Sequence, residues 1–156
     1  MFRNMRYKER ELSREETIEL IKSGKDGVLA VHGEDGYPYG VPINYGYYDG
    51  KIYIHCRGSE SHKLDAIRAN PKVCLTVVGK RELIKEKYTT KYSSAIVFGK
   101  AHIISEAEEI VMAMGRMMEG LAPEFVDGAM KCAKDSAGAM VMIEITPEHI
   151  SGKASK

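Results

Sequence analysis

Apolar residues near the start of the chain recur at helical spacing. Ser13 and Glu16 have the spacing of a capping box, in which each side chain satisfies a backbone donor at a helix start. Ile18, Leu20 and Ile21 follow as an apolar stripe. The sequence therefore predicts a helix that begins at Ser13, behind a short, basic and irregular N-terminal stretch.

The pattern then changes to that of strands. The apolar run 28–31, the segment 39–48, rich in aromatic and β-branched residues, and the alternating segment 51–56 each have the composition of a strand. The Asp49-Gly50 pair between the last two is a hairpin signal, because both positions of such a turn favour positive φ. This region is therefore predicted to be a three-stranded meander.

The rest of the chain mixes both patterns. Residues 79–92 are charged and contain tyrosines but show no clear period, and Gly99 is placed to form a bend or bulge in the strand that follows. Ser105 and Glu108 form a second capping box. The predicted elements are helices at 61–69, 105–118 and 124–134 and strands at 73–78, 95–104 and 139–145.

The order of these elements limits the fold class. The strands, about six in number, come in hairpin-linked groups that do not alternate regularly with the four helices, which excludes a doubly wound parallel sheet. A mainly β fold, a small antiparallel barrel with peripheral helices, fits better. The interior of such a barrel is filled by side chains. A ligand is therefore expected on the outside, at a seam or between two copies.

Composition narrows the class of protein further. The chain has 156 residues, of which 44% are hydrophobic and 29% charged, and this favours a single globular domain spanning residues 1–156. A formal net charge of +1 argues against a nucleic-acid partner. No apolar run approaches the roughly 20 residues that span a bilayer, and the N-terminus is too polar for a signal peptide. We therefore expect a cytoplasmic protein with no membrane partner.

Cysteines and histidines do not form a recognisable metal pattern. The three cysteines lack CxxC spacing and lie in apolar settings, so buried free thiols are expected. No two of the five histidines are four residues apart, and adjacent residues of a strand, such as His55 and Cys56, point to opposite faces. The sequence therefore predicts no metal site. A Met-rich stripe at 112–118 fits core or dimer interface better than a pliable binding surface.

The most informative stretch for chemistry lies at the predicted helix start near residue 61. Ser61, His62 and Lys63 begin a helix after a Gly/Ser loop, and a helix start presents free backbone N–H groups with partial positive charge. Hydroxyl and cationic side chains added to these donors make a phosphate site. The alternative is an ordinary serine cap with solvated His62 and Lys63. Cations are mildly unfavourable in a first helical turn, and a bound anion explains their presence.

Two other segments offer weaker signals. Pro42 within a strand indicates a sheet edge with free backbone groups, which suit either a ligand or protection from aggregation. Ser93 and Ser94 place two hydroxyls at the start of an apolar strand, where serines are usually turn residues. Neither segment defines a site by itself.

Several segments, taken in order, resemble one known family. They are residues 36–47, 49–55, 62–65, 70–74, 93–101 and 150–153. The family is the NimA-like group of 5-nitroimidazole resistance proteins, within the pyridoxamine 5′-phosphate oxidase-related superfamily of FMN-binding split barrels. The resemblance covers nearly the whole chain and implies a six-stranded antiparallel split β-barrel. It also implies a homodimer with FMN at the subunit interface.

The resemblance further implies which residues contact the flavin. Lys63 stands where the superfamily places its flavin-phosphate lysine, and His55 stands where NimA-like proteins have their proposed functional, catalytic histidine. Ser93 and Ser94 stand where the oxidases present polar groups from the second subunit. The complete set implied in this way is Val41, Pro42, Ile43, Asn44, Ile54, His55, Ser61, His62, Lys63, Ser93 and Ser94.

Departures from the oxidase pattern shape the functional hypotheses. Asn44 and Tyr39 replace a lysine and an arginine of the oxidases, and the arginine-rich C-terminal substrate motif is missing. Pyridoxamine phosphate oxidation is therefore not the expected activity. The leading hypothesis is an FMN-dependent oxidoreductase that reduces a small acceptor, a nitroaromatic such as a 5-nitroimidazole. The alternatives are a haem- or deazaflavin-binding module, with His55, His32 or His102 as an axial haem ligand, and a non-catalytic flavin-holding dimer.

Overall fold

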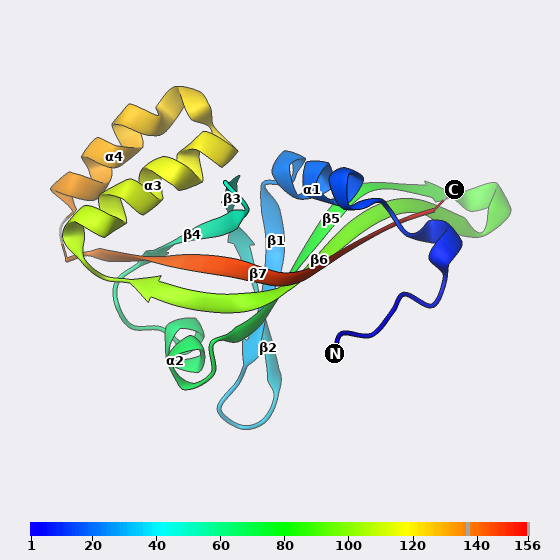
Figure 1. Cartoon of the computed structure of the whole chain (residues 1–156), viewed down its shortest axis with the longest axis horizontal. Helices are drawn as coiled ribbons and strands as arrows, with labels where there is room; N and C mark the ends of the chain where they lie inside the picture. The colour runs from blue at the N-terminus through cyan, green and yellow to red at the C-terminus, as the bar shows by residue number, and fades with distance from the viewer. Residues whose placement is uncertain (137, 156) are drawn as a thin grey trace.

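Seven strands form one antiparallel sheet in the order β2-β1-β5-β6-β7-β4-β3 (Figure 1). The computed structural model describes residues 1–136 and 138–155. The strands are β1 (Asp26–His32), β2 (Pro38–Asn44), β3 (Gly46–Tyr48), β4 (Lys51–Arg57), β5 (Lys72–Ile84), β6 (Thr89–Ile104) and β7 (Met140–Ala154). The α-helices are α1 (Arg14–Ser23), α2 (His62–Ala69), α3 (Ala107–Leu121) and α4 (Val126–Asp135), and the short 3₁₀ helices are η1 (Lys8–Arg10), η2 (Lys85–Lys87) and η3 (Pro123–Phe125).

The sheet curls without closing, so the fold is a split barrel. Its two outermost strands, β2 and β3, are separated along the chain by one residue, Tyr45. A single segment therefore supplies both edges of the sheet. The Tyr45 side chain is fully buried, and its hydroxyl donates to the Ile21 carbonyl of α1 at 2.6 Å. This bond fixes the point where the chain crosses from one edge to the other.

Local signals account for several element boundaries. The Ser13–Glu16 capping box is present, with the Glu16 amide donating to Ser13 Oγ at 3.1 Å and the Ser13 amide donating to the Glu16 carboxylate at 2.7 Å. Asp49 and Gly50 both have positive φ, as the predicted hairpin requires. Pro42 lies in β2, which is an edge strand. These three predictions are confirmed.

Two hydrophobic clusters hold the sheet and helices together. The larger fills the inside of the barrel, where the side chains of Leu29, Leu75 and Ile143 are fully buried. The smaller lies between the sheet and the α3–α4 hairpin and includes Met114 and Met142. The Met-rich stripe of α3 is thus mainly core, as its spacing favours. No helix in the described part of the chain is long and apolar enough to span a bilayer.

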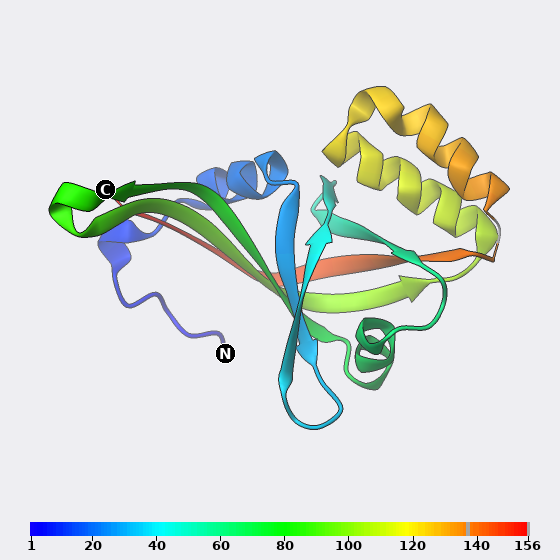
Figure 2. The same cartoon turned by 180° about the vertical axis from the view of Figure 1, so that it is seen from behind.

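The structure adds one detail to the sequence-based prediction and corrects three others. Residues 79–92 continue β5 and β6 as a long hairpin with η2 at its tip; we call them the arm (Figure 2). The last strand does not end at Thr146-Pro147 but continues to Ala154, past a register shift at Phe98/Gly99. The Ser105–Glu108 capping box is absent, because Glu106 is the N-cap of α3. Tyr45 divides one predicted strand into β2 and β3, so there are seven strands.

Both faces of the central strands carry apolar side chains. Pairing places Val28, Thr76 and Ile96 in one row across β1, β5 and β6, and Ala30, Cys74 and Phe98 in the next. The rows lie on the outer face, where Val28, Val78, Ile96 and Phe98 are exposed. Only one of the three cysteines, Cys56, is buried; Cys74 is half-buried and Cys132 is exposed, contrary to the sequence expectation. The outer face is thus an apolar surface that the chain covers only in part, with the Phe2 ring stacked on that of Phe98.

Candidate functional site

Two unpaired strand edges meet where the barrel is split. β2 pairs with β1 along one edge only. β3 pairs with β4 only as far as Tyr53, so residues 54–57 of β4 have β7 as their single neighbour. The free edges of β2 and of residues 54–57 form a seam, and backbone donors and acceptors without sheet partners are available there. The segments that the sequence analysis associated with the flavin, 41–44 and 54–55, lie on these two strands.

The first turn of α2 lies at the end of the seam. Ser61 is its N-cap, and the Leu64 amide donates to Ser61 Oγ at 3.3 Å. The Arg68 guanidinium donates to the Ser59 carbonyl at 2.7 Å and to Asp65 at 2.7 Å, so the loop before the helix is tied to the helix itself. Ser61 and His62 are exposed and Lys63 is half-buried. The helix start that the sequence predicts to bind a phosphate is therefore accessible and anchored.

Side chains connect α2 to both strands of the seam. The His62 ring stacks on the Tyr39 ring of β2, with centroids 4.2 Å apart and an angle of 18° between the planes. The Lys63 side chain reaches β4, where its charge acts on His55 and Cys56. The three elements are thereby brought together, and the role of Tyr39 as the stacking partner of His62 was not predicted from the sequence.

The environment of His55 favours a neutral imidazole. His55 is exposed but its ring is partly desolvated by its neighbours, and this partial burial and the nearby Lys63 ammonium both lower its pKa below the usual 6.5. Burial raises the pKa of the Cys56 thiol, and Lys63 opposes this only in part. At neutral pH the site therefore contains a neutral histidine, a protonated thiol and one lysine cation.

The β2 residues that were predicted to bind the flavin lie on two different sides of the strand. Val41 and Ile43 pack against the barrel core, whereas Pro42 and Asn44 are exposed. The Asn44 amide donates to the Asp26 carboxylate of the neighbouring strand. Position 44, where the oxidases have lysine, thus holds a neutral amide beside a carboxylate. A phosphate is disfavoured at that point, and the α2 start is the better anion site.

Three other predicted residues are placed differently from the rest. The Ile54 side chain is 1% exposed and belongs to the core, so only its backbone faces the seam. Ser93 and Ser94 lie in β6, which is separated from β2 by two strands and from β4 by one. Ser94 pairs with the exposed Val78 on the outer face, whereas Ser93 Oγ lies against Gly79. Within one subunit neither serine joins the seam, and the two hydroxyls do not share a face.

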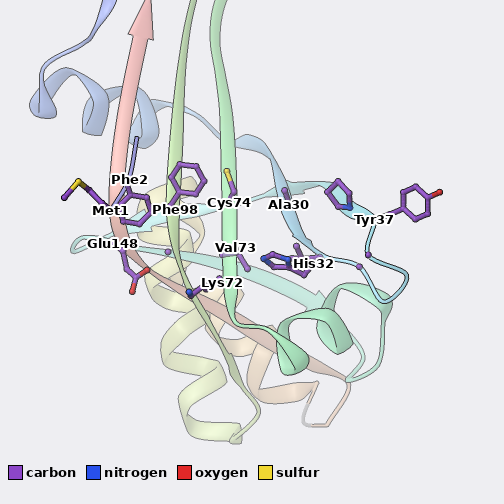
Figure 3. Close-up of a pocket in the computed structure, with 15 residues that line it drawn as sticks. Met1, Phe2, Ala30, His32, Tyr37, Lys72, Val73, Cys74, Phe98 and Glu148 are labelled. Carbon is purple, nitrogen blue, oxygen red and sulfur yellow. The ribbon is translucent and has the colours of Figure 1, made fainter. Parts of the chain in front are cut away.

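A pocket lies elsewhere, on the outer face of the sheet (Figure 3). It has a volume of about 690 Å³ and is bounded by β1, β5, β6, the β1–β2 hairpin and the N-terminal residues. His32, Lys72, Cys74 and Phe98 contribute to its lining, and no residue predicted to bind the flavin does. The sequence signal that points to it is the run of apolar residues on both faces of β1, β5 and β6.

Comparison with known families identifies the chain at family level. A family model described as pyridoxamine 5′-phosphate oxidase matches residues 13–154. No match was found among curated proteins. The family resemblance stated from the sequence motifs is therefore confirmed by the family model.

Solved structures share the fold of this chain. A candidate 5-nitroimidazole antibiotic resistance protein from Bacteroides thetaiotaomicron is 21% identical with a TM-score of 0.72, over 94% of this chain and 90% of that one. A FAD-binding protein from Mesorhizobium loti is 24% identical with a TM-score of 0.68, over 94% and 98%. A FAD and haem binding protein from Mycobacterium smegmatis is 18% identical with a TM-score of 0.79, over 94% and 74%. At these identities the likeness confirms the predicted split-barrel fold.

Proposed function

The chain belongs to the pyridoxamine 5′-phosphate oxidase family, and from this premise we propose that it is a flavoprotein that holds FMN at the seam. The observation that carries the proposal is the meeting of two unpaired strand edges with the start of α2. The edges offer backbone groups to a planar heterocycle, and the helix start offers amides and Lys63 to a phosphate. The family match and the flavin-binding proteins of similar fold support it.

The residues present fit the two ends of this cofactor differently. At the phosphate end, the first-turn amides of α2, Ser61 and Lys63 supply donors, and His62 is held beside them by Tyr39. At the ring end, residues 41–44 and 54–55 supply backbone groups and few charges. FMN, when bound, supplies the electron transfer. The chain orients it and, through Lys63, holds the negative charge of the phosphate.

His55 is the residue of the seam best suited to handle a proton. Its ring is exposed enough to meet a small molecule, and it is neutral at neutral pH because burial and Lys63 lower its pKa. A neutral imidazole donates a hydrogen bond from one nitrogen and accepts a proton at the other. We place His55 beside the substrate, which we propose is a small nitroaromatic of the 5-nitroimidazole type. The similarity to the Bacteroides thetaiotaomicron protein supports this choice of substrate.

A homodimer forms part of the same proposal. The outer face carries exposed Val28, Val78, Ile96 and Phe98, and a contiguous apolar patch of this kind is typical of an interaction surface. Sedimentation equilibrium tests this point, and we expect twice the 17.4 kDa mass of the chain.

The absorption spectrum of the freshly purified protein tests the cofactor. We expect the two visible bands of an oxidised flavin, and release of FMN, identified by mass, when the protein is heated. A single intense Soret band would instead indicate haem and would make His55 the first ligand to replace. A colourless protein that does not take up added FMN would contradict the proposal. Turnover with a nicotinamide donor and a 5-nitroimidazole separates an enzyme from a flavin-holding protein.

A further inference from the structure

A group of cationic and aromatic side chains gathers far from the seam, at the base of the arm. It consists of Arg6, Tyr7, Arg10, Tyr92 and Lys153, and we call it the tyrosine–cation cluster. The guanidinium carbons of Arg6 and Arg10 lie 5.2 and 5.4 Å from the centre of the Tyr7 ring. Lys153 Nζ lies 5.5 Å from the Tyr7 ring and 5.7 Å from the Tyr92 ring. Three cations thus share two aromatic rings.

Backbone hydrogen bonds hold the three parts of the chain that build this cluster. Glu11 forms a bridge with Lys153, and the Leu12 amide donates to the Gly152 carbonyl at 2.9 Å. On the other side of β7, the Ser155 amide donates to the Tyr92 carbonyl at 2.9 Å. The Tyr92 amide in turn donates to Ser155 Oγ at 2.8 Å. The N-terminal segment, β6 and β7 are therefore fixed relative to one another. Figure 2 shows them side by side, with the C-terminus beside the arm.

The charges of the tyrosine–cation cluster are not balanced by carboxylates. None of the five ion pairs found among residues 1–136 and 138–155 includes Arg6, Arg10 or Lys153. Glu11, which follows Arg10 in the chain, is joined to Lys153 by a backbone bridge. Cation–π contacts at exposed sites compensate only a part of the mutual repulsion of three cations. A multivalent anion would relieve the rest.

The Tyr92 hydroxyl lies where such an anion would find a third kind of contact. Arg10 Nη1 lies 3.5 Å from the Tyr92 hydroxyl oxygen. Arg10 and, to a smaller extent, Lys153 lower the pKa of Tyr92, and Lys153 Nζ lies 5.7 Å from the centre of the same ring. A guanidinium, an ammonium and a hydroxyl that converge on one point are the donors that recognise a phosphate group.

We propose that the tyrosine–cation cluster is a second anion site, which binds a phosphate group between Arg10, Lys153 and the Tyr92 hydroxyl. The group is either inorganic phosphate or the phosphate monoester of a metabolite, because the side chains of the cluster would contact only the phosphate. Lys153 is paired with Ser94, which lies on the outer face, in the β6–β7 ladder. The site therefore borders the apolar outer face. The proposal does not depend on flavin binding at the seam, because the two sites share no residue.

An NMR titration of the purified full chain with inorganic phosphate, at constant ionic strength set with chloride, tests the proposal. We expect saturable shifts of the backbone amides of Tyr92 and Lys153. Shifts at Lys63 and Leu64 report the α2 start separately, so failure at one site is distinguishable from failure at the other. Titration with AMP and with adenosine separates the two sources: tighter binding of AMP than of phosphate, with no binding of adenosine, indicates a phosphate monoester.

Single charge-removing variants complete the test. Lys153→Gln and Arg10→Gln should each weaken phosphate binding about tenfold, since a hydrogen bond to a charged group contributes this order of affinity. Lys87→Gln, at the tip of the arm, removes the same charge without touching the cluster and should leave the affinity unchanged. Glu11→Gln removes a carboxylate next to Arg10 in the chain and should strengthen binding. Equal weakening by Lys87→Gln and Lys153→Gln, or shifts without saturation, would overturn the proposal.

Discussion

The barrel has a hydrogen-bonded side and a side that is joined only by side chains. On the first side, β5, β6 and β7 pair along their lengths, from Lys72 opposite Lys100 to Ile84 opposite Thr89 and from Ser93 opposite Ala154 to Ile104 opposite Met142. On the second side, no ladder joins β2 to β4. Backbone pairing therefore makes one side rigid and self-sufficient, whereas the seam is held by individual contacts.

This difference is the reason for proposing a ligand site at the seam. Paired strands have no free backbone groups to offer, and their inner side chains fill the core. At the seam, the backbone edges are free, and Tyr45, the Tyr39–His62 pair and Lys63 hold the neighbouring elements in place. Substitutions of these side chains should affect the seam in proportion to what each one holds.

Loss of the Tyr45 side chain should break the seam most severely. Tyr45→Ala removes a fully buried aromatic ring and should lower the free energy of unfolding by about 3–5 kcal/mol, measured by chemical denaturation. Tyr45→Phe leaves the Ile21 carbonyl without its donor and should cost about 1–3 kcal/mol. Tyr48→Ala, in the exposed part of the β3–β4 hairpin, is the matched control. If Tyr48→Ala costs as much as Tyr45→Ala, Tyr45 does not anchor the seam.

Removal of the Lys63 ammonium should affect ligand binding more than stability. Lys63→Ala should weaken FMN binding by about 1.5–3 kcal/mol, the contribution of a hydrogen bond to a charged group, and fluorescence titration of added FMN measures it. Lys134→Ala removes the same charge from the exposed face of α4 and should leave FMN affinity unchanged. Unchanged affinity in Lys63→Ala would mean that the flavin phosphate does not bind at α2.

Local chemical signals allowed much of the fold to be predicted from the sequence. The Ser13–Glu16 box, the Asp49-Gly50 turn and Pro42 each act through neighbouring backbone groups, so no knowledge of distant contacts is needed. Residues 79–92 showed no strand pattern, because an arm that is exposed on both faces has no reason to alternate apolar and polar residues. The final strand continues past Pro147, which pairs with Gly99 directly beside a register shift, and strands tolerate proline at such irregularities.

The sequence predicted which segments form the candidate site, but not the directions in which their side chains point. The motifs placed the flavin at residues 41–44, 54–55 and 61–63, which the seam does bring together. They did not reveal that Ile54 and Ser93 point inward, since a family pattern records positions and not side-chain orientation. Tyr39 and His62 are far apart in the sequence, and their contact exists only because β2 begins beside α2. Such non-local pairs require the structure.

The Tyr39–His62 stack should contribute a smaller, coupled effect. A double-mutant cycle with Tyr39→Leu and His62→Ala should give a coupling energy of about 0.5–1.5 kcal/mol in the free energy of unfolding, as stacked aromatic pairs do. The same cycle across Tyr39 and Tyr48 should be additive, because Tyr48 belongs to the β3–β4 hairpin. Additive effects at Tyr39 and His62 would show that the stack does not link β2 to α2.

The smallest effect should come from protonation of His55, because solvent screens this exposed group. Burial and Lys63 lower its pKa below 6.5, so below pH 6.5 the unfolded chain binds more protons at this residue than the folded chain. The free energy of unfolding should therefore fall as the pH falls from 6.5 through the lowered pKa. His55→Gln should lose less stability than the wild type between pH 7 and pH 5, measured by urea denaturation at each pH.

The titration of His55 itself sharpens this last test and connects it to the ligand. NMR of the His55 ring protons should give a midpoint below 6.5 in the wild type, and Lys63→Gln should raise it, because burial then remains as the only cause of the shift. A phosphate bound at Lys63 neutralises the same charge, so it should also raise the midpoint. A midpoint that neither Lys63→Gln nor phosphate moves would show that the two residues of the seam are not coupled.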